Sequence, residues 1–398
     1  MTEATAQVPQ WAAGRPYAVV AITKHGVEIA RRLQAGLPGV DVYHPDKFAR
    51  GDEGVLGIHT FTGSVVDQVP LLWGRYQGII GIVSLGAMVR MVAPLLRDKR
   101  TDPGVVVVDD RARHAISVLS GHLGGANDLA REVARVLGAE PVITTASDVG
   151  ETVAVDLLGR AFGWEIENFD QVTAVSAAVV NEERVLVVQE AGEPGWWPAD
   201  KTLPPNLRVV ARVEQAREEP FDAALVITPR VLAAEEAAWL LRRGVLYRPK
   251  VLVVGVGCNR GTAADEIEAA LLETLDAHRL SVKSVRNLAT IDRKADEPGL
   301  IEVCRRYGWP LVTYRADELN AVPLPHPSET VFKYVGAWGV SEPAARLSSG
   351  ADGWLVEKVK RGNVTLSVCL VPHPPHPAVV GSAAVAGGLT PDERGEPR

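Results

Sequence analysis

Apolar and polar residues alternate with two different periods along residues 17–163. Short runs rich in β-branched residues predict buried strands at 17–23, 40–44, 78–85, 104–110, 114–120 and 141–147. Between several of these runs, apolar residues recur every three or four positions, which predicts helices at 26–37, 86–98, 126–138 and 151–163. This alternation indicates an α/β domain with a doubly wound, mostly parallel sheet over residues 16–164.

Beyond residue 164, the alternation of strand and helix patterns is weak over 165–246 and strong again over 247–373. Residues 165–246 predict a small middle region of undefined fold, with strand-like runs at 184–190, 207–213 and 222–228. Residues 247–373 predict a second α/β domain, which ends in an edge hairpin over 353–372 that turns at Gly362-Asn363. We expect a flexible N-terminus over 1–15 and a disordered tail over 374–398, which is rich in Pro, Gly and Ala.

Composition narrows the class of protein. The 398 residues carry 42 basic and 49 acidic side chains, a net charge of −7, which disfavours a nucleic-acid-binding protein. The three cysteines lie far apart, which argues against a disulfide framework or a cysteine metal site. No signal-peptide pattern and no apolar run long enough to span a membrane are present, so we expect a cytoplasmic protein.

The stretch SVLSGHLGGANDLAREVARVLG (117–138) places His122 in a glycine-rich turn before a helix that begins near Ala126 or Asn127. Glycines permit a close backbone approach, and free amides at a helix start attract anions. Such a turn suits a carboxylate or a developing oxyanion, with His122 as proton acceptor or donor. The alternative is that His122 only caps or packs and that the glycines make a tight turn.

Two further strand ends carry small polar residues. Ser84, Gly86 and Arg90 follow one strand, and Thr144 and Thr145 follow another. Because the carboxyl ends of parallel strands meet at one sheet edge, we expect these residues to join the glycine-rich turn in a single site. The competing interpretation of the second group is a capping box formed by Thr145 and Asp148, with Asp148 structural.

Cations cluster in the stretch from residue 90 to residue 113, at Arg90, Arg97, Lys99, Arg100, Arg111 and Arg113. They form either a solvated surface of mixed charge or a binding surface for a substrate with several carboxylates. In the C-terminal domain, the glycines around Gly257-Cys258-Asn259 miss the dinucleotide-binding spacing by one residue. Cys258 has no histidine nearby in sequence, which favours a packing role over a nucleophile.

Several motifs together resemble the cobalt-precorrin-5A hydrolase family of anaerobic cobalamin biosynthesis. The segments that resemble its N-terminal domain are MVRMVAPLLRDKRTDPGVVVVDD and SVLSGHLGGANDLAREVARVLGAEPVITTASD. Those that resemble its C-terminal domain are VGVGCNRGT, NLATIDRKADEPGL, PSETVFKYVGAWGVSEPAARLSSG and VEKVKRGNVTLSV. The C-terminal region also resembles a stand-alone protein of the aerobic pathway. The similarity spans about residues 16–372 and is weakest over 165–245.

The resemblance implies a hydrolase that acts on a carbon–carbon bond of a cobalt-bearing tetrapyrrole. The family opens the ring A δ-lactone and releases acetaldehyde, giving cobalt-precorrin-5B. Cobalt would arrive in the substrate, so no protein cofactor or metal site is expected, and neighbouring methyltransferases of the pathway are candidate partners. We expect His122 to be catalytic and the substrate contacts to be Ser84, Gly86, Arg90, Arg113, Ser120, Gly121, Gly124, Gly125, Asn127, Thr144 and Thr145. Candidate contacts in the C-terminal domain are Gly257, Cys258, Asn259 and Ser328.

A function from another class stays open. The chain could be a non-catalytic tetrapyrrole carrier or scaffold that passes intermediates between enzymes of the same pathway. Release of acetaldehyde from the substrate distinguishes an enzyme from such a carrier. A nucleotide-dependent oxidoreductase is poorly supported, because neither α/β domain has a proper phosphate-binding fingerprint.

Overall fold

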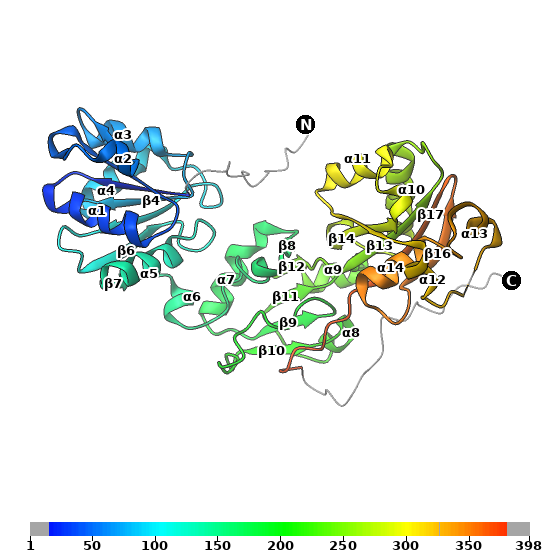
Figure 1. The fold of residues 1–398 in the computed structure, drawn as a ribbon. Helices are drawn as coiled ribbons and strands as arrows, with labels where there is room; N and C mark the ends of the chain where they lie inside the picture. The colour runs from blue at the N-terminus through cyan, green and yellow to red at the C-terminus, as the bar shows by residue number, and fades with distance from the viewer. Residues whose placement is uncertain (1–15, 326, 380–398) are drawn as a thin grey trace. The chain divides into compact units, whose positions relative to one another are not determined.

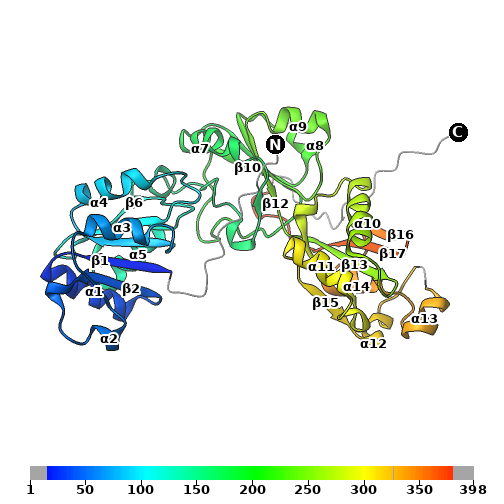
Figure 2. The ribbon, with the colours of Figure 1, turned by 90° about the horizontal axis from the view of Figure 1, so that it is seen from above.

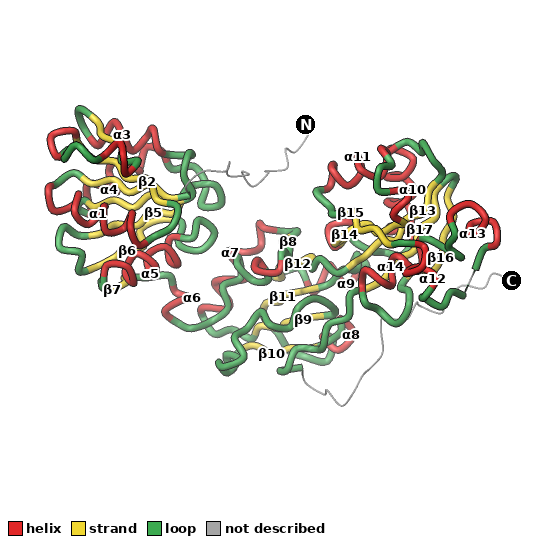
Figure 3. The backbone as a smooth tube through the Cα atoms, viewed as in Figure 1, coloured by secondary structure: helices red, strands yellow, loops and turns green. Residues whose placement is uncertain are grey.

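The computed structural model describes residues 16–325 and 327–379, and its contacts divide the chain into two units, residues 1–157 and 158–398. Three sheets organise the described residues, one in the first unit and two in the second (Figure 1). Figure 3 shows how strands and helices alternate along most of the chain. The mixed α/β fold expected from the sequence is confirmed.

The first unit is built on a seven-stranded sheet of order β3-β2-β1-β4-β5-β6-β7. Its strands are β1 (Tyr17–Ala21), β2 (Val40–Pro45), β3 (His59–Phe61), β4 (Gly78–Ile82), β5 (Gly104–Val108), β6 (His114–Leu119) and β7 (Glu140–Val142). Its helices are α1 (Lys24–Gly36), α2 (Glu53–Leu56), α3 (Val65–Leu72), α4 (Leu85–Val92), α5 (Ala126–Leu137) and α6 (Ala146–Val149).

Both faces of this sheet are covered, which confirms the doubly wound prediction. One apolar core packs α1 and α5 against the sheet, and a second core packs α3 and α4 against it. Figure 2 shows helices on both faces of the sheet. Strands β4 and β5 have no exposed residue, as expected for strands that are covered on both sides.

The direction of the last two strands decides where the loops lie. Strand β5 runs parallel to β4, but β6 runs antiparallel to β5, with Val105 opposite Leu119 and Val108 opposite Ala115. Strand β7 is parallel to β6. The carboxyl ends of β6 and β7 therefore point toward the edge where β1, β4 and β5 begin, not toward the edge where those strands end.

The segment after β7 departs from the sequence prediction. The expected strand over 141–147 ends at Val142, and the helix expected over 151–163 is a series of turns followed by a 3-10 turn, Arg160–Phe162. Val153 and Val155, two residues apart, are both buried, a spacing that the turns accommodate and a helix does not. As a result, Asp156 lies in a turn and reaches back toward β6.

The middle region is a regular sheet, whereas the sequence left its fold undefined. Its strand order is β10-β9-β11-β12-β8, with β9 to β12 parallel and β8 antiparallel at the edge. The strands are β8 (Glu165–Ile166), β9 (Val185–Gln189), β10 (Leu207–Val210), β11 (Ala223–Ile227) and β12 (Gly244–Arg248). The helices are α7 (Val172–Val180), α8 (Val213–Ala216) and α9 (Ala234–Leu240).

The C-terminal sheet has the order β15-β14-β13-β17-β16, and the predicted edge hairpin is confirmed. Its strands are β13 (Leu252–Cys258), β14 (Val285–Ile291), β15 (Leu311–Tyr314), β16 (Val356–Arg361) and β17 (Val364–Leu370). Its helices are α10 (Ala264–Ala277), α11 (Pro298–Tyr307), α12 (Ala316–Asn320), α13 (Glu329–Val335) and α14 (Ser341–Ser349).

The first part of the expected tail is packed rather than free. His376 is buried and stacks on Trp196 with ring centroids 4.5 Å apart, and Val379 forms a bridge with Val209 of β10. The prediction of disorder is therefore wrong for residues 374–379. Residues 1–15 and 380–398, for which flexibility was also predicted, lie outside the described residues.

Candidate functional site

The glycine-rich turn links the carboxyl end of β6 to α5, which begins at Ala126 as the sequence predicted. The turn packs tightly against the chain that enters β5. A Cβ atom on Gly104 would lie 2.5 Å from the carbonyl oxygen of Gly124, and one on Gly124 would lie 2.8 Å from the carbonyl oxygen of Ser120. Glycine is needed at both positions because backbone approaches backbone too closely for a side chain.

The backbone amides of this turn are less available than the sequence suggested. The amide of Gly125 donates to the carbonyl of His122 (2.9 Å), and that of Asn127 donates to the carbonyl of Gly121 (3.0 Å). Ala126 likewise donates to Ser120, at 3.2 Å. The expectation of a free amide at Gly125 is therefore wrong, because the turn folds back on itself. In the described ranges, the amides of Gly121 and Gly124 have no such partner.

Carboxylates flank the imidazole ring of His122 on both sides. Its Nδ1 lies 3.0 Å from Asp156 Oδ1, and its Nε2 lies 3.0 Å from Asp148 Oδ2. Ser147 Oγ is also 3.0 Å from Nε2. The His122 side chain is 18% exposed, so this group is partly shielded yet open to a ligand.

A network of hydrogen bonds fixes Asp148. The side-chain amide of Asn127 donates through Nδ2 to Asp148 Oδ2 (2.9 Å) and to Thr145 Oγ1 (2.7 Å). The Thr145 hydroxyl donates to the same carboxylate oxygen (2.9 Å). Arg131 donates to Asp148 Oδ1 at 2.5 Å. Thr145 precedes α6, but its side chain bonds the Asp148 carboxylate instead of a helix amide, so the side-chain arm of the expected capping box is absent.

The charges of this group support one another. The hydrogen bond with Asp156 is the largest influence on His122 and raises its pKa, although burial opposes the charged form. Burial also disfavours a charged Asp148, but hydrogen bonds from Arg131, Thr145 and His122 lower the pKa of that carboxyl. The two carboxylates thus favour the protonated form of His122.

This arrangement bears on the chemistry that His122 can perform. A general base needs a neutral ring with a free nitrogen, whereas both ring nitrogens here face carboxylates. The two carboxylates favour the protonated ring, so His122 is better suited to donate a proton than to accept one. For donation, one ring N–H exchanges its carboxylate partner for the substrate. Sequence reasoning treated Asp148 as a cap and missed Asp156, because the helix expected over 151–163 gave no reason to place that side chain at the turn.

The structure gathers part of the predicted site at one edge of the sheet. We call this the His122 edge and define it by residues 96–103, 120–127, 144–148 and 156. Of the predicted contacts, it contains Ser120, Gly121, Gly124, Gly125, Asn127, Thr144 and Thr145 together with His122. Thr144 is exposed and none of the bonds above involves its side chain, while Asn127 is buried and serves the network around Asp148.

The other predicted contacts lie at the opposite edge, so the expectation of a single site was wrong. We call it the Arg90 edge and define it by Thr23, Ser84, Gly86, Arg90 and 109–113. It is formed by the carboxyl ends of β1, β4 and β5 and the start of β6. Arg113 lies there, just before β6. Because β6 is reversed, a five-residue strand, roughly 15 Å long, separates the two edges.

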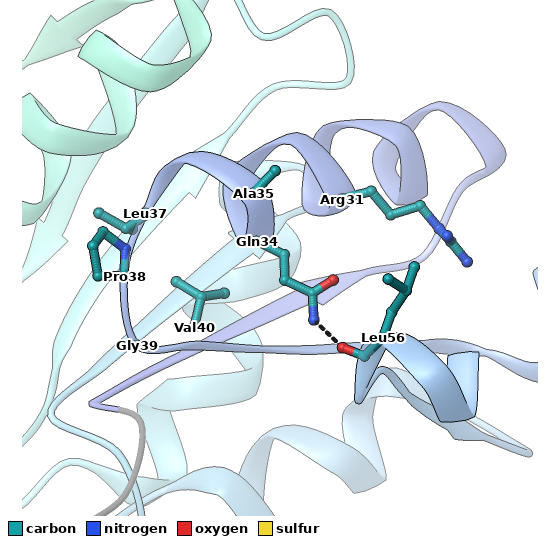
Figure 4. Close-up of a pocket in the computed structure, with 8 residues that line it drawn as sticks. All are labelled: Arg31, Gln34, Ala35, Leu37, Pro38, Gly39, Val40 and Leu56. Carbon is teal, nitrogen blue, oxygen red and sulfur yellow. Dashed lines mark hydrogen bonds between the residues drawn. The ribbon is translucent and has the colours of Figure 1, made fainter. Parts of the chain in front are cut away.

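A cavity of about 390 Å³ lies in the same unit, and its lining includes no residue of the His122 edge or the Arg90 edge (Figure 4). It is lined by the end of α1, the start of β2 and Leu56, and Gln34 donates to the Leu56 carbonyl across it (2.9 Å). Arg31 at its rim is held by Asp52 and Glu53. No residue predicted as a contact lines this cavity.

The C-terminal candidates have structural partners. Gly257 and Cys258 end β13, where burial raises the pKa of the Cys258 thiol. Asn259 Nδ2 donates to Asn363 in the hairpin turn (2.7 Å), and Ser328 Oγ accepts from the amide of Val331 as the cap of α13. Across the residues described, no hydrogen bond joins Ser328 to 257–259.

The described residues contain neither a candidate metal site nor a helix that could span a membrane. No group of three or more His, Cys, Asp and Glu side chains in residues 16–325 and 327–379 could hold a metal ion. Within the same residues, every helix is too short or too polar to cross a bilayer. The absence of a protein cofactor stays a prediction.

Comparisons with known proteins cover most of the chain. Family models described as Cobalamin synthesis G N-terminal, Cobalamin biosynthesis central region and Cobalamin synthesis G C-terminus match residues 67–148, 153–249 and 252–369. "Protein CobE" of Sinorhizobium sp. is 33% identical over 120 residues, which cover 29% of this chain and 78% of that protein.

Two full-length relatives carry one name. A protein of Priestia megaterium named "Cobalt-precorrin-5A hydrolase" is 56% identical over 357 residues, covering 90% of this chain and 95% of the relative. A protein of Salmonella typhimurium with the same name is 34% identical over 361 residues, covering 88% and 96%. With three family models in order along its length and these relatives, the chain belongs to the cobalamin synthesis G family.

Proposed function

We propose that this protein is a cobalt-precorrin-5A hydrolase, which opens the ring A δ-lactone of its substrate and releases acetaldehyde. The observation that carries the proposal is the 56% identity with a relative of that name over 95% of the relative's length. The substrate is a cobalt-bearing tetrapyrrole, and the cobalt belongs to the substrate. Neighbouring methyltransferases as partners are a further part of the proposal, suggested by the pathway alone.

The reaction places two demands on the protein. Opening a lactone requires water to attack the carbonyl carbon, donors for the oxyanion and a proton for the leaving oxygen. The subsequent carbon–carbon cleavage requires a base that removes the proton from the new hydroxyl, while the conjugated macrocycle accepts the electron pair. A single group that first gives and then takes one proton serves the leaving oxygen in both steps, while the attacking water loses its proton to solvent as the carboxylate forms.

His122 is the group that we assign to this role. As an imidazolium it donates a proton to the lactone oxygen as the ring opens. Once neutral, it removes the same proton from the hydroxyl as acetaldehyde leaves. Asp156 holds the ring in place, and the amides of Gly121 and Gly124 are the candidate donors for the oxyanion, because those of Gly125, Ala126 and Asn127 are engaged within the turn.

Release of acetaldehyde tests the proposal. Purified protein is mixed with cobalt-precorrin-5A, and acetaldehyde is measured by its enzymatic reduction with NADH. The proposal predicts stoichiometric release that depends on the protein and goes to completion. Binding of the substrate without acetaldehyde above the buffer control would overturn it and favour the tetrapyrrole carrier.

A further inference from the structure

Residues 96–103 form a loop that lies against the glycine-rich turn. The loop leads into β5 at Gly104, at the edge where β6 ends. The carbonyl oxygen of Asp102 lies 3.1 Å from the position that a Cβ atom of Gly124 would occupy. Two backbones are therefore in direct contact, and whatever occupies the turn beside His122 also faces this loop.

Asp102 fixes the shape of the loop from inside. Its carboxylate is buried and accepts hydrogen bonds from the backbone amides of Arg97 (2.9 Å) and Asp98 (3.1 Å). The amide of Asp102 in turn donates to the carbonyl of Asp98 (2.8 Å). The loop is thus held by its backbone and by the Arg100–Asp98 pair, and in the described residues the side chains of Arg97 and Lys99 form no hydrogen bond within it.

Arg97 and Lys99 are available for a ligand. Both are exposed, and within the described part of the chain neither forms an ion pair, whereas the neighbouring Arg100 is paired with Asp98 at 2.6 Å. His122 itself lies between Asp148 and Asp156, and Arg131 of the neighbouring α5 contacts Asp128 and Asp148. Among the described residues of this edge, Arg97 and Lys99 are therefore the cations whose charge no ion pair offsets.

We propose that Arg97 and Lys99 bind peripheral carboxylates of the tetrapyrrole substrate and so position its lactone at His122. This inference rests on the proposed function. The guanidinium of Arg97 matches a carboxylate with two parallel hydrogen bonds, and Lys99 adds a mobile point charge. Leu96, which is 44% exposed and adjacent to Arg97, offers an apolar contact for the macrocycle. The pair selects tetrapyrroles with free acid side chains over amidated or esterified ones.

Binding of an unreactive corrin tests the proposal without turnover. The probes are a cobalt corrin with free carboxylate side chains, which has no lactone to open, and its methyl ester. The double variant Arg97→Gln/Lys99→Gln of the full chain is compared with the double variant Lys24→Gln/Arg111→Gln. Lys24 and Arg111 are exposed cations at and beside the Arg90 edge, so this control removes the same charge. Visible absorbance of the corrin gives the dissociation constants.

We expect the double loop variant to bind the acid corrin at least tenfold more weakly than the wild type, and the control variant to stay within twofold. With cobalt-precorrin-5A, the same loop variant should show a raised KM and a nearly unchanged kcat. Equal binding of the acid and the ester by the wild type, or an unchanged dissociation constant in the loop variant, would overturn the inference. If the corrin binds as expected and acetaldehyde is never released, only the proposed function fails.

Discussion

The two edges of the N-terminal sheet use similar residues for different purposes. At the Arg90 edge, several polar groups make local bonds: Thr23 accepts from the amide of Gly26, Arg90 donates to the carbonyl of Gly86, and Asp109 accepts from amides of the turn before β6. One bond between distant segments joins Thr23, as donor, to Asp110. At the His122 edge, side chains from three separate segments converge on one imidazole. The pKa shifts of His122 and Asp148 at this point of convergence support our proposal that the second edge binds the substrate.

The difference teaches that strand direction, not strand order, sorts the loops. All the segments predicted to form one site follow or precede strands of the same sheet. The antiparallel pairing of β5 with β6 sends Ser84 and Arg90 to one edge and His122 to the other. The same pairing separates the cations of residues 90–113. Arg90, Arg111 and Arg113 lie at the Arg90 edge, whereas Arg97 and Lys99 lie beside the glycine-rich turn.

The largest expected effect is on the rate of acetaldehyde release, and it compares a histidine at the His122 edge with one beside the Arg90 edge. His122→Asn should lower the rate of acetaldehyde release by at least about 100-fold, because the donated proton is lost. His114→Asn, at the exposed start of β6, is the matched control and should retain wild-type activity. Single-turnover kinetics measure both. Comparable activity of the two variants would remove His122 from the reaction.

The second prediction concerns the carboxylate behind His122. Asp156→Asn keeps a hydrogen-bond acceptor but removes the charge that raises the pKa of His122. The high-pH limb of the rate profile, where the acid form is lost, should move down by about one pH unit. Asp128→Asn, an exposed carboxylate on α5, serves as the control. An unshifted profile in Asp156→Asn would contradict the positioning role.

A glycine from each edge gives the third prediction. A Cβ atom at Gly124 would overlap the backbone of Ser120, so Gly124→Ala should lower the free energy of unfolding by about 1–3 kcal/mol. Gly86→Ala should be neutral or slightly stabilising, because its Cβ meets only the movable end of Arg90 and alanine favours a helix. Urea denaturation measures both changes, and equal effects would show that the turn has room.

The smallest effect lies in the pH dependence of stability. The pKa of His122 is raised above its ordinary value of 6.5, so its stabilising contribution is complete below pH 6.5 and is lost as pH rises through the folded-state pKa. His122→Asn should therefore differ from the wild type more at pH 6 than at pH 9. Denaturation midpoints at pH 6 and pH 9 test this. The same difference between variant and wild type at both pH values would show that the contacts of His122 with Asp148 and Asp156 do not stabilise the charged ring.

Periodicity and composition were enough to predict the architecture of the two α/β domains. The helix at 126–137 and the hairpin at Gly362 follow directly from spacing and turn chemistry. The fold of the middle sheet was not predicted, because a long Pro- and Gly-rich stretch separates its short strands. Pairing between distant strands also leaves little local signal in the sequence.

Part of the candidate site could be predicted from local sequence, and the part that depends on distant contacts could not. His122, Asn127 and Thr145 stood out because their residue types are unusual beside glycines and strand ends. Asp156 did not, since its contact with His122 spans 34 residues and depends on a turn where the spacing suggested a helix. The reversal of β6 is likewise a tertiary choice, because its sequence suits either direction.

The most direct test of where the substrate binds is hydrogen–deuterium exchange with the free-acid corrin. If the His122 edge is the binding site, the corrin should slow amide exchange in 96–103 and 120–127 and leave 84–90 and 109–113 unchanged. Protection confined to 84–90 and 109–113 would place the ligand at the Arg90 edge and contradict the account.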